Sequence, residues 1–410
     1  MRGSIVKRPG KSNGNSKPVE QYHIVYDLGP RWDEAKGRQR RQQKWEKVPA
    51  PNTLKHAQKL LAKRLNEVHR GEFVEPSQIL FRQFADRWVN NYAKGQVRPG
   101  TLADYLSLFK NHLFPYFGDR PLADITVENV QGFKSAKLAA GLSQQTVKHL
   151  LRLLRQMLGH AVEWELLRTN PAKAVRNPRV PKADMDVLPP AEAQAFLQAT
   201  PPKWQPMFYT AISTGLRLGE LLAMKWENLE RQSRRYFVRE TLARARGDYP
   251  GGFAAPKTEG SARSVDLTPT CLSLLEEHQK RQAAEKLAAG AAYEDNGLIF
   301  ATALGRPLDQ KNVVHRQFHS ALETAGLRRI RFHDLRHTCA SLLINKGVSP
   351  KYIQRQLRHD SIQTTFDRYG HLFPETHEEA ARLLDAALSG SAPSNTHLSN
   401  THLTEQAETA

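Results

Sequence analysis

The stretch "LRHDSIQTTFDRYGHL", residues 357–372, ends an amphipathic pattern with a tyrosine that stands between an arginine and a glycine. This tyrosine, Tyr369, follows His359 by ten positions (369 − 359 = 10). A tyrosine near the end of such a stretch usually packs in a core, but it can also bind a ligand or act as a nucleophile. The stretch alone leaves these three roles open, so the rest of the chain must distinguish them.

Three other short stretches hold the cations and histidines that a reactive tyrosine would need. They are "TGLRLGE" (214–220) with Arg217, "PKTEGSARSVDLT" (256–268) with Lys257, and "HDLRHT" (333–338) with His333 and Arg336. Each residue on its own is more often structural, as a salt-bridged arginine, a turn lysine or a core histidine. A functional hypothesis therefore depends on the whole set.

The two arginines suit the charge that develops when a DNA phosphodiester is attacked. The non-bridging oxygens of the pentavalent phosphorane-like state gain negative charge, which planar guanidinium groups stabilise through paired hydrogen bonds. Arg217 and Arg336 could clamp the phosphate in this way without a metal ion. His333 and His359 could add donors and help to move protons near neutral pH.

The remaining two residues could supply the bond-forming and bond-breaking steps. Tyr369 could attack phosphorus and form a covalent phosphotyrosine, which stores the bond energy for religation. Lys257, on a mobile turn, could protonate the leaving 5′ oxygen. This chemistry predicts no ATP, metal or other cofactor.

The ordered set Arg…Lys…His-x-x-Arg…His…Tyr resembles the active site of the tyrosine recombinases, specifically the phage-type integrases. "TGLRLGELLAMKWENL" is similar to the first arginine box of that family, and "PKTEGSARSVDL" to the β-hairpin that carries its lysine. "RFHDLRHTCASLLINKGVSPKYIQRQLRHDSIQTTFDRYGHL" resembles the second box. The resemblance implies a site-specific DNA recombinase that integrates DNA through a 3′-phosphotyrosyl intermediate, with excision left open. The catalytic residues it implies are Arg217, Lys257, His333, Arg336, His359 and Tyr369, with Tyr369 as the nucleophile.

One residue departs from the family pattern. The family usually has glycine immediately before the second histidine, and this chain has Arg358. A glycine there indicates a tight backbone at a helix junction. Arg358 is therefore expected either to alter the local geometry around His359 or to add a phosphate contact.

The charge of the chain indicates a polyanionic partner. The 410 residues carry a net charge of +19, distributed as +9 over residues 1–76, +8 over 77–180, +4 over 181–388 and −2 over 389–410. An excess that extends over whole domains favours nucleic acid. An acidic membrane surface is the weaker alternative, because no Lys/Arg-faced helix with a Trp/Phe/Leu edge stands out.

The chain is predicted to be multidomain and mainly α-helical with small β elements. Residues 1–76 resemble a small α+β arm-type DNA-binding domain, with strands in "QYHIVYDLG" and "RQQKWEKVP", a basic loop in "RWDEAKGRQRRQQK" and then a helix. Residues 77–180 resemble a helical core-binding, SAM-like domain, with helices beginning near Phe81, Pro99, Val127 and Ser143. Residues 181–388 are expected to form the mixed, mainly α catalytic domain, with strands at 235–267, and residues 389–410 a disordered tail.

The resemblance also implies partners. These are double-stranded DNA carrying attachment sites, three further copies of the chain in a homotetramer on two duplexes, a host DNA-bending protein and an excision factor. The helix expected in "ETHEEAARLLDAALSG" (375–390) either packs within its own chain or docks on a neighbouring protomer. The chain lacks a bilayer-length apolar run and a signal-type N-terminus, and it has only Cys271 and Cys339. We therefore expect a cytoplasmic protein at the nucleoid of a bacterial host, with no membrane partner.

Three alternatives remain open at this stage. "HDLRH" spaces His333 and His337 as in H-E-x-x-H zinc hydrolases, although that hypothesis leaves the charge, the arginines and Tyr369 unexplained. A non-catalytic DNA-binding protein explains the charge but not the spaced residue set. A type IB-like topoisomerase shares the chemistry, and it would relax supercoils without strand exchange.

Overall fold

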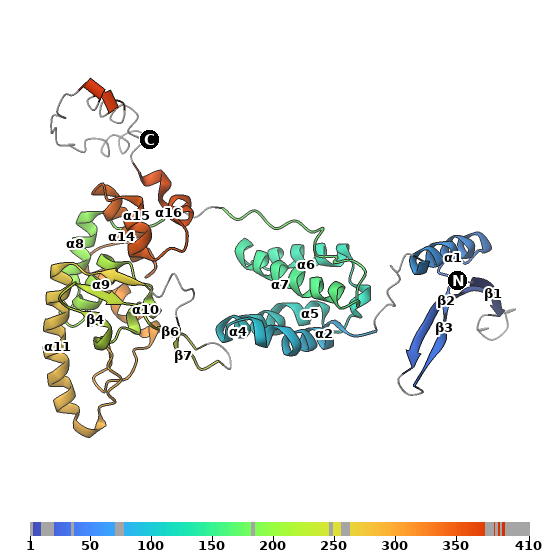
Figure 1. Ribbon diagram of the computed structural model, residues 1–410, viewed down its shortest axis with the longest axis horizontal. Helices are drawn as coiled ribbons and strands as arrows, with labels where there is room; N and C mark the ends of the chain where they lie inside the picture. The colour runs from blue at the N-terminus through green and yellow to red at the C-terminus, as the bar shows by residue number, and fades with distance from the viewer. Residues whose placement is uncertain are drawn as a thin grey trace. The chain divides into compact units, whose positions relative to one another are not determined.

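The computed structural model describes residues 3–9, 20–33, 37–69, 78–181, 185–245, 249–255 and 263–373, with five further positions between 381 and 389. The chain divides into two compact units, residues 1–182 with 246–249, and residues 183–245 with 250–410 (Figure 1). No helix among the described residues is both long and apolar enough to span a bilayer.

The first unit begins with a three-stranded antiparallel sheet and a helix. The strands β1 (Gly3–Pro9), β2 (Glu20–Asp33) and β3 (Arg38–Lys47) pair in the order β1-β2-β3, and α1 (Leu54–His69) packs on them. Ile24 and Tyr26 alternate inward from β2 and are buried against Ala57 of the helix. The prediction of a basic loop between the strands is wrong over most of its length. Strand β2 continues to Asp33 and β3 begins at Arg38, because these polar residues still pair through their backbones.

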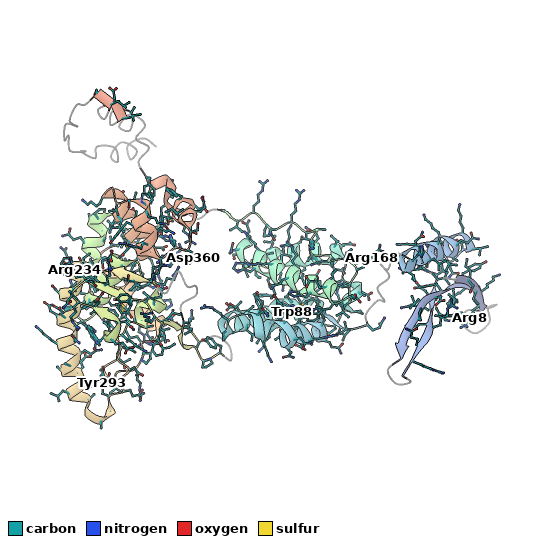
Figure 2. All side chains as sticks on the ribbon, in the orientation of Figure 1. Arg8, Trp88, Arg168, Arg234, Tyr293 and Asp360 are labelled. Carbon is teal, nitrogen blue, oxygen red and sulfur yellow. The ribbon has the colours of Figure 1, made fainter. Side chains whose placement is uncertain are left out.

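The remainder of the first unit is helical, and its helices begin where the sequence predicts. Their bounds are α2 (Phe81–Trp88), a π-helical turn η1 (Val89–Ala93), α3 (Lys94–Gln96), α4 (Pro99–Leu108), a second π turn η2 (Phe109–Leu113), α5 (Phe114–Phe117), the 3₁₀ turn η3 (Leu122–Asp124), α6 (Val127–Ala139) and α7 (Gln144–Glu163). Trp88 is fully buried among them and donates its indole N–H to His160 Nδ1 at 2.6 Å (Figure 2). The Thr126 hydroxyl accepts from the Asn129 N–H at 3.2 Å and Asn129 Oδ1 accepts in return, so asparagine completes the cap that glutamate usually makes.

The second unit surrounds a small sheet with helices. The helical elements are α8 (Pro190–Ala199), α9 (Gln205–Thr214), α10 (Leu218–Leu222), the 3₁₀ turn η4 (Trp226–Asn228), α11 (Pro269–Ala289), the 3₁₀ turn η6 (Gly290–Ala292), α12 (Gln310–Asn312), the π turn η7 (Val313–Phe318), α13 (His319–Thr324), α14 (Asp334–Asn345), α15 (Pro350–Leu357), α16 (Ile362–Tyr369) and the 3₁₀ turn η8 (Gly370–Leu372). The strands are β4 (Leu229–Glu230), β5 (Arg235–Phe237) and β8 (Ser264–Asp266) in one sheet, and β6 (Thr241–Ala243) with β7 (Gly252–Ala254) in another. The strand-rich patch predicted at 235–267 is confirmed, as is the mainly helical fold class.

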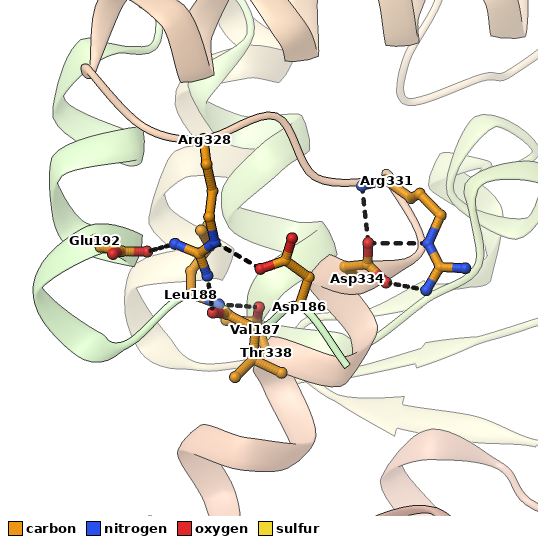
Figure 3. A network of polar contacts seen from close by, with 8 residues as sticks. All are labelled: Asp186, Val187, Leu188, Glu192, Arg328, Arg331, Asp334 and Thr338. Atoms are coloured by element: carbon orange, nitrogen blue, oxygen red, sulfur yellow. Dashed lines mark hydrogen bonds and ion pairs between the residues drawn. The ribbon is translucent and has the colours of Figure 1, made fainter. Parts of the chain in front are cut away.

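A network of ion pairs fixes the first residues of the second unit to the segment that leads into α14 (Figure 3). Arg328 donates to Asp186 at 2.6 Å, to Glu192 at 2.5 Å and to the Val187 carbonyl at 2.6 Å. Asp334, at the start of α14, accepts from the Arg331 guanidinium at 2.8 Å. The end of α14 that carries His333 and Arg336 is therefore held from both sides by charged hydrogen bonds.

The helix predicted over residues 375–390 lies mostly outside the described residues. The described positions Ala381, Leu384, Asp385, Leu388 and Ser389 are helical and exposed.

Candidate active site

Three elements meet at the side chain of Arg336. It lies in the first turn of α14 and is 3% exposed. Its Nη1 donates to the Gly215 carbonyl at 2.7 Å, and its Nη2 donates to the Leu357 carbonyl. These carbonyls end α9 and α15, so the guanidinium satisfies two C-terminal carbonyls and is fixed in place by them.

Arg217 begins the next helix and keeps its charged end accessible. It is the N-cap of α10, and its backbone N–H donates to Glu220 Oε2 at 2.9 Å. Its Nη1 lies 2.9 Å from Glu220 Oε1. The Arg217 side chain is 41% exposed whereas that of Glu220 is 4% exposed, so a buried carboxylate orients a guanidinium that solvent or a ligand can reach.

Arg358 has an unusual backbone and a fully buried side chain. It caps α15 with a φ of 54° in the left-handed region that favours glycine, so the predicted tight junction is present. Its Nη2 donates to Glu220 Oε2, and its side chain is 0% exposed. Its Nε and Nη1 are buried and have no hydrogen-bond partner within the described part of the chain. The side chain thus points at Glu220 rather than outward.

The charges of this cluster do not balance. Among the residues that the structure describes, Arg217, Arg336 and Arg358 face one carboxylate, that of Glu220, which leaves two positive charges in excess. Burial and the charges of Arg217 and Arg358 lower the pKa of Arg336 to about 9. Burial alone would raise the pKa of Glu220, but Arg358 and Arg217 hold it below its usual value. An anion between the guanidiniums would relieve this repulsion.

Tyr369 lies at the end of α16 with its hydroxyl against α14. The residue is 0% exposed and packs with Cys339, Ala340 and Leu357. Its Oη is 2.8 Å from His337 Nδ1. Burial raises the pKa of Tyr369 to about 12, although Arg336 and Arg368 oppose this effect.

The two predicted histidines differ in their surroundings. His359 is 6% exposed, its Nδ1 is 2.9 Å from the Thr365 hydroxyl, and its ring stacks 6.3 Å from that of Tyr369. Burial, followed by the charge of Arg336, lowers the pKa of His359 to about 3. His333 is exposed at the start of α14. Partial loss of hydration and the neighbouring His337 and Arg336 lower the pKa of His333 as well.

Five of the six predicted residues thus lie in one part of the second unit: Arg217, His333, Arg336, His359 and Tyr369. Lys257 lies in 256–262, outside the described residues. The sequence interpretation missed the bond of His337 to Tyr369 and the carboxylate of Glu220. Their signals were present, since His337 follows His333 by one helical turn and Glu220 is the acid in the first turn after Arg217. Over the described ranges, no group of three or more His, Cys, Asp or Glu side chains is arranged to hold a metal ion.

Comparisons with known proteins match both units. Residues 186–376 match the phage integrase family, and residues 80–138 match the phage integrase N-terminal SAM-like domain. A tyrosine recombinase XerC-like protein of Caldanaerobacter subterraneus subsp. tengcongensis is 27% identical over 352 residues, 81% of this chain and 90% of that protein. The ICEBs1 integrase of Bacillus subtilis is 26% identical and covers 83% of this chain and 92% of its own length.

Solved structures share the fold. The Tn1549 transposon integrase in complex with transposon right end DNA superposes with a TM-score of 0.63 at 18% identity, over 76% of this chain and 100% of that one. A lambda integrase tetramer bound to a Holliday junction gives a TM-score of 0.55 at 19% identity, over 86% and 95%.

Fold and site together define a tyrosine recombinase, an enzyme that breaks and rejoins DNA at specific sites. Within that class, the chain belongs to the phage integrase family.

Proposed function

We propose that this recombinase cleaves each strand by attack of Tyr369 Oη on the scissile phosphorus. The attack forms a 3′-phosphotyrosyl link and releases a 5′ hydroxyl, and the reverse reaction joins the strand to a new partner. The observation that carries the proposal is the uncompensated positive charge of the arginine cluster beside the tyrosine. The charge of Arg217 lowers the pKa of Arg336, and the charge of Arg336 opposes the rise in the pKa of Tyr369, so the three side chains interact electrostatically.

The described contacts support roles for Arg217, Arg336 and His359, and the roles of Lys257 and His333 rest on the resemblance to the family. Arg217 and Arg336 stabilise the phosphorane, one from the accessible side of the cluster and one from its buried side. His359 is neutral at pH 7, and when Thr365 donates to its Nδ1 the Nε2–H is the donor that positions the phosphate. Lys257 and His333 deliver the proton to the leaving 5′ oxygen.

The three predicted domains divide the work on double-stranded DNA. Residues 181–388 catalyse, residues 77–180 bind the core of the attachment site, and residues 1–76 bind more distant arm sites. Residues 1–76 and 77–180 carry net charges of +9 and +8, which suits repeated contacts with phosphates. A host DNA-bending protein and an excision factor would set the direction of the reaction at the bacterial nucleoid.

The working assembly is a homotetramer on two duplexes, held together by the C-terminal helix. Leu384 and Leu388, one turn apart, are 62% and 79% exposed. An apolar groove of about 540 Å³ in the second unit is lined by residues that include Leu197, Ile212 and Leu343. The helix of one copy occupies this groove on the next copy.

A covalent-trapping experiment tests the nucleophile and maps the site. Purified protein is incubated in EDTA with nicked duplexes from the ends of its own genetic element, and adducts are resolved on denaturing gels. Wild type forms a 3′-linked adduct, whereas Tyr369→Phe binds the same duplex and forms none. Adducts of Tyr369→Phe would contradict the proposal, and a wild-type reaction that requires metal would favour the hydrolase. Relaxation of supercoils without exchange between two sites would indicate the topoisomerase.

A further inference from the structure

His337 lies against the atom that would react. Its Nδ1 is 2.8 Å from Tyr369 Oη across 32 residues of sequence. The rings are 5.7 Å apart at an angle of 63°, which directs the imidazole edge at the hydroxyl. His337 is 5% exposed and Tyr369 0%. The hydrogen bond is therefore closed to bulk water, and a proton leaving the phenol meets the imidazole first.

Both groups of this hydrogen bond are neutral at pH 7. Burial raises the pKa of Tyr369 to about 12, so the phenol keeps its proton at neutral pH. Burial lowers the pKa of His337, although Asp334 opposes the effect, so the imidazole is neutral. With both groups neutral, the phenol O–H donates to Nδ1 in the tautomer that carries the imidazole hydrogen on Nε2, and only in that tautomer can Nδ1 accept the proton of Tyr369.

We propose that His337 is a catalytic residue, the general base that takes the Tyr369 proton at Nδ1 during strand cleavage. The proposal rests on the proposed function, since Tyr369 must be the nucleophile. The Oη–P bond forms, the P–O5′ bond breaks, and the Oη proton moves to Nδ1. The leaving O5′ receives a separate proton from Lys257 or His333, and on religation the proton of Nδ1 returns to Tyr369.

The surroundings suit a base that must release its proton again. The groups that face His337 include a carboxylate, a neutral imidazole and three guanidiniums. They are Asp334, His333 and Arg336 from its own helix and N-cap, Arg331 from the preceding segment, and Arg368 from α16. The Asp334 carboxylate stabilises the imidazolium while it exists. The surrounding arginines keep that state short-lived, so the proton is available for religation.

Single-turnover cleavage of the mapped duplex separates proton transfer from positioning. His337→Asn keeps an acceptor near the place of Nδ1 but cannot take a proton, and His337→Ala removes both functions. Both variants should bind the duplex within about twofold of wild type and cleave about 10²-fold more slowly. His278→Asn is the matched control, since His278 is also buried, at 8% exposure, and bonds to the Ile299 carbonyl. It should cleave at the wild-type rate.

Replacing the bridging 5′ oxygen with sulfur identifies the end of the reaction at which His337 acts. A thiolate leaves without a proton. The duplex with a bridging sulfur (the sulfur duplex) should therefore restore the cleavage rate of Lys257→Ala, whereas both His337 variants should still cleave it slowly. The wild-type rate should level off above the titration of the imidazole. The rate of His337→Asn should continue to rise about tenfold per pH unit toward the pKa of the phenol.

Cleavage by His337→Asn within threefold of wild type would reduce His337 to a positioning residue and overturn the proposal. Rescue of His337→Ala by the sulfur duplex would move its action to the leaving group and also overturn it. His337→Gln provides a second variant if His337→Ala fails to fold. If Tyr369→Phe forms no adduct while His337→Asn is fast, only the His337 step fails, whereas adducts of Tyr369→Phe contradict both proposals.

Discussion

Arg358 occupies a backbone position that suits glycine, and a contact of its side chain offsets the strain of that position. A non-glycine residue in the left-handed region costs about 1–2 kcal/mol. In return, the buried guanidinium bonds to Glu220, the carboxylate that also orients Arg217. A hydrogen bond to a charged acceptor contributes about 1.5–3 kcal/mol, and Arg217 still pairs with Glu220 when Arg358 is removed. The bond of Arg358 to Glu220 therefore offsets the backbone strain.

Glycine and alanine at position 358 separate these two effects. Arg358→Ala should lower the free energy of unfolding by about 1–3 kcal/mol, because it breaks a hydrogen bond to a buried carboxylate, and Arg358→Gly by about 1 kcal/mol less than that, because glycine relieves the backbone. Arg234 provides the matched control, with a φ of 50° and an exposed side chain. Arg234→Ala should leave the free energy of unfolding unchanged, and Arg234→Gly should raise it by up to about 1 kcal/mol. Urea unfolding of the full chain measures all four variants, and a neutral Arg358→Ala would show that the ion pair contributes nothing.

The sequence could predict single residues where chemistry and spacing coincide, and it could not predict their distant partners. The set that includes Arg217, Arg336 and Tyr369 follows from what a phosphodiester requires. The bond from His337 to Tyr369 depends on how α14 packs against α16, and periodicity reports only that a residue faces inward. The pairing of Arg358 with Glu220 spans 138 residues, so no local pattern contains it.

At the scale of elements, the end of α9 sets the position of Arg336. Gly215 caps α9 with a φ of 65°, and its carbonyl accepts from Arg336. A Cβ on Gly215 would lie 2.5 Å from Leu357 Cδ2. The close approach of α9 to α15 therefore requires glycine for both its backbone and its lack of a side chain.

Two alanine substitutions distinguish backbone strain from this close approach. Gly347 follows α14 with a φ of 69°, and a Cβ there would meet nothing within 4 Å. Gly347→Ala should cost about 1 kcal/mol and leave the cleavage rate unchanged. Gly215→Ala should cost more, because Leu357 must move, and it should slow cleavage by displacing a carbonyl that holds Arg336. Equal stability and equal rates for the two variants would show that the packing at Gly215 has no effect on the site.

Helices were easier to predict than strands for a physical reason. The starts of α6 and α7 follow from the caps Thr126 and Ser143, that of α4 from a proline in its first turn, and that of α2 from its periodic apolar residues. Strand β1 was not predicted, because Gly3–Pro9 becomes a strand only by pairing with β2. The prediction of a basic loop was wrong for the same reason, because backbone pairing between strands tolerates arginines wherever their side chains reach solvent.

At the scale of the molecule, buried neutral histidines should make the fold sensitive to acid. The pKa of His359 is lowered to about 3 in the folded chain, against about 6.5 in an unfolded chain. A depressed pKa contributes stability that is complete above pH 6.5 and is lost as the pH falls toward 3. Each buried histidine of this kind lowers the free energy of unfolding by up to about 1.4 kcal/mol for each pH unit that the pH falls within that window.

Urea titrations of the full chain at pH 7.5, 6 and 5 check this dependence. The transition of the second unit should move to lower urea as the pH falls, and His359→Gln should reduce the slope. His315→Gln, which alters an exposed histidine, serves as the control and should leave the slope unchanged. An unchanged slope for His359→Gln would mean that this imidazole is already solvated in the folded chain.

The uneven distribution of charge predicts which part of the molecule dominates its response to salt. Residues 1–76 carry +9 of the net +19, whereas residues 389–410 carry −2. Each phosphate that a cation neutralises adds about 0.9 to the slope of log affinity against log salt concentration.

Deletion of residues 1–76 should therefore reduce the slope by several units on DNA that contains the arm sites. It should leave adduct formation on a short duplex with only the crossover site intact, because the arginine cluster and Tyr369 lie entirely in the second unit. Deletion of residues 389–410 is the control and should alter neither quantity. Fluorescence anisotropy between about 50 and 200 mM salt measures the slopes. If the slope of log affinity against log salt concentration is unchanged after deletion of residues 1–76, the main DNA contacts belong to the other domains.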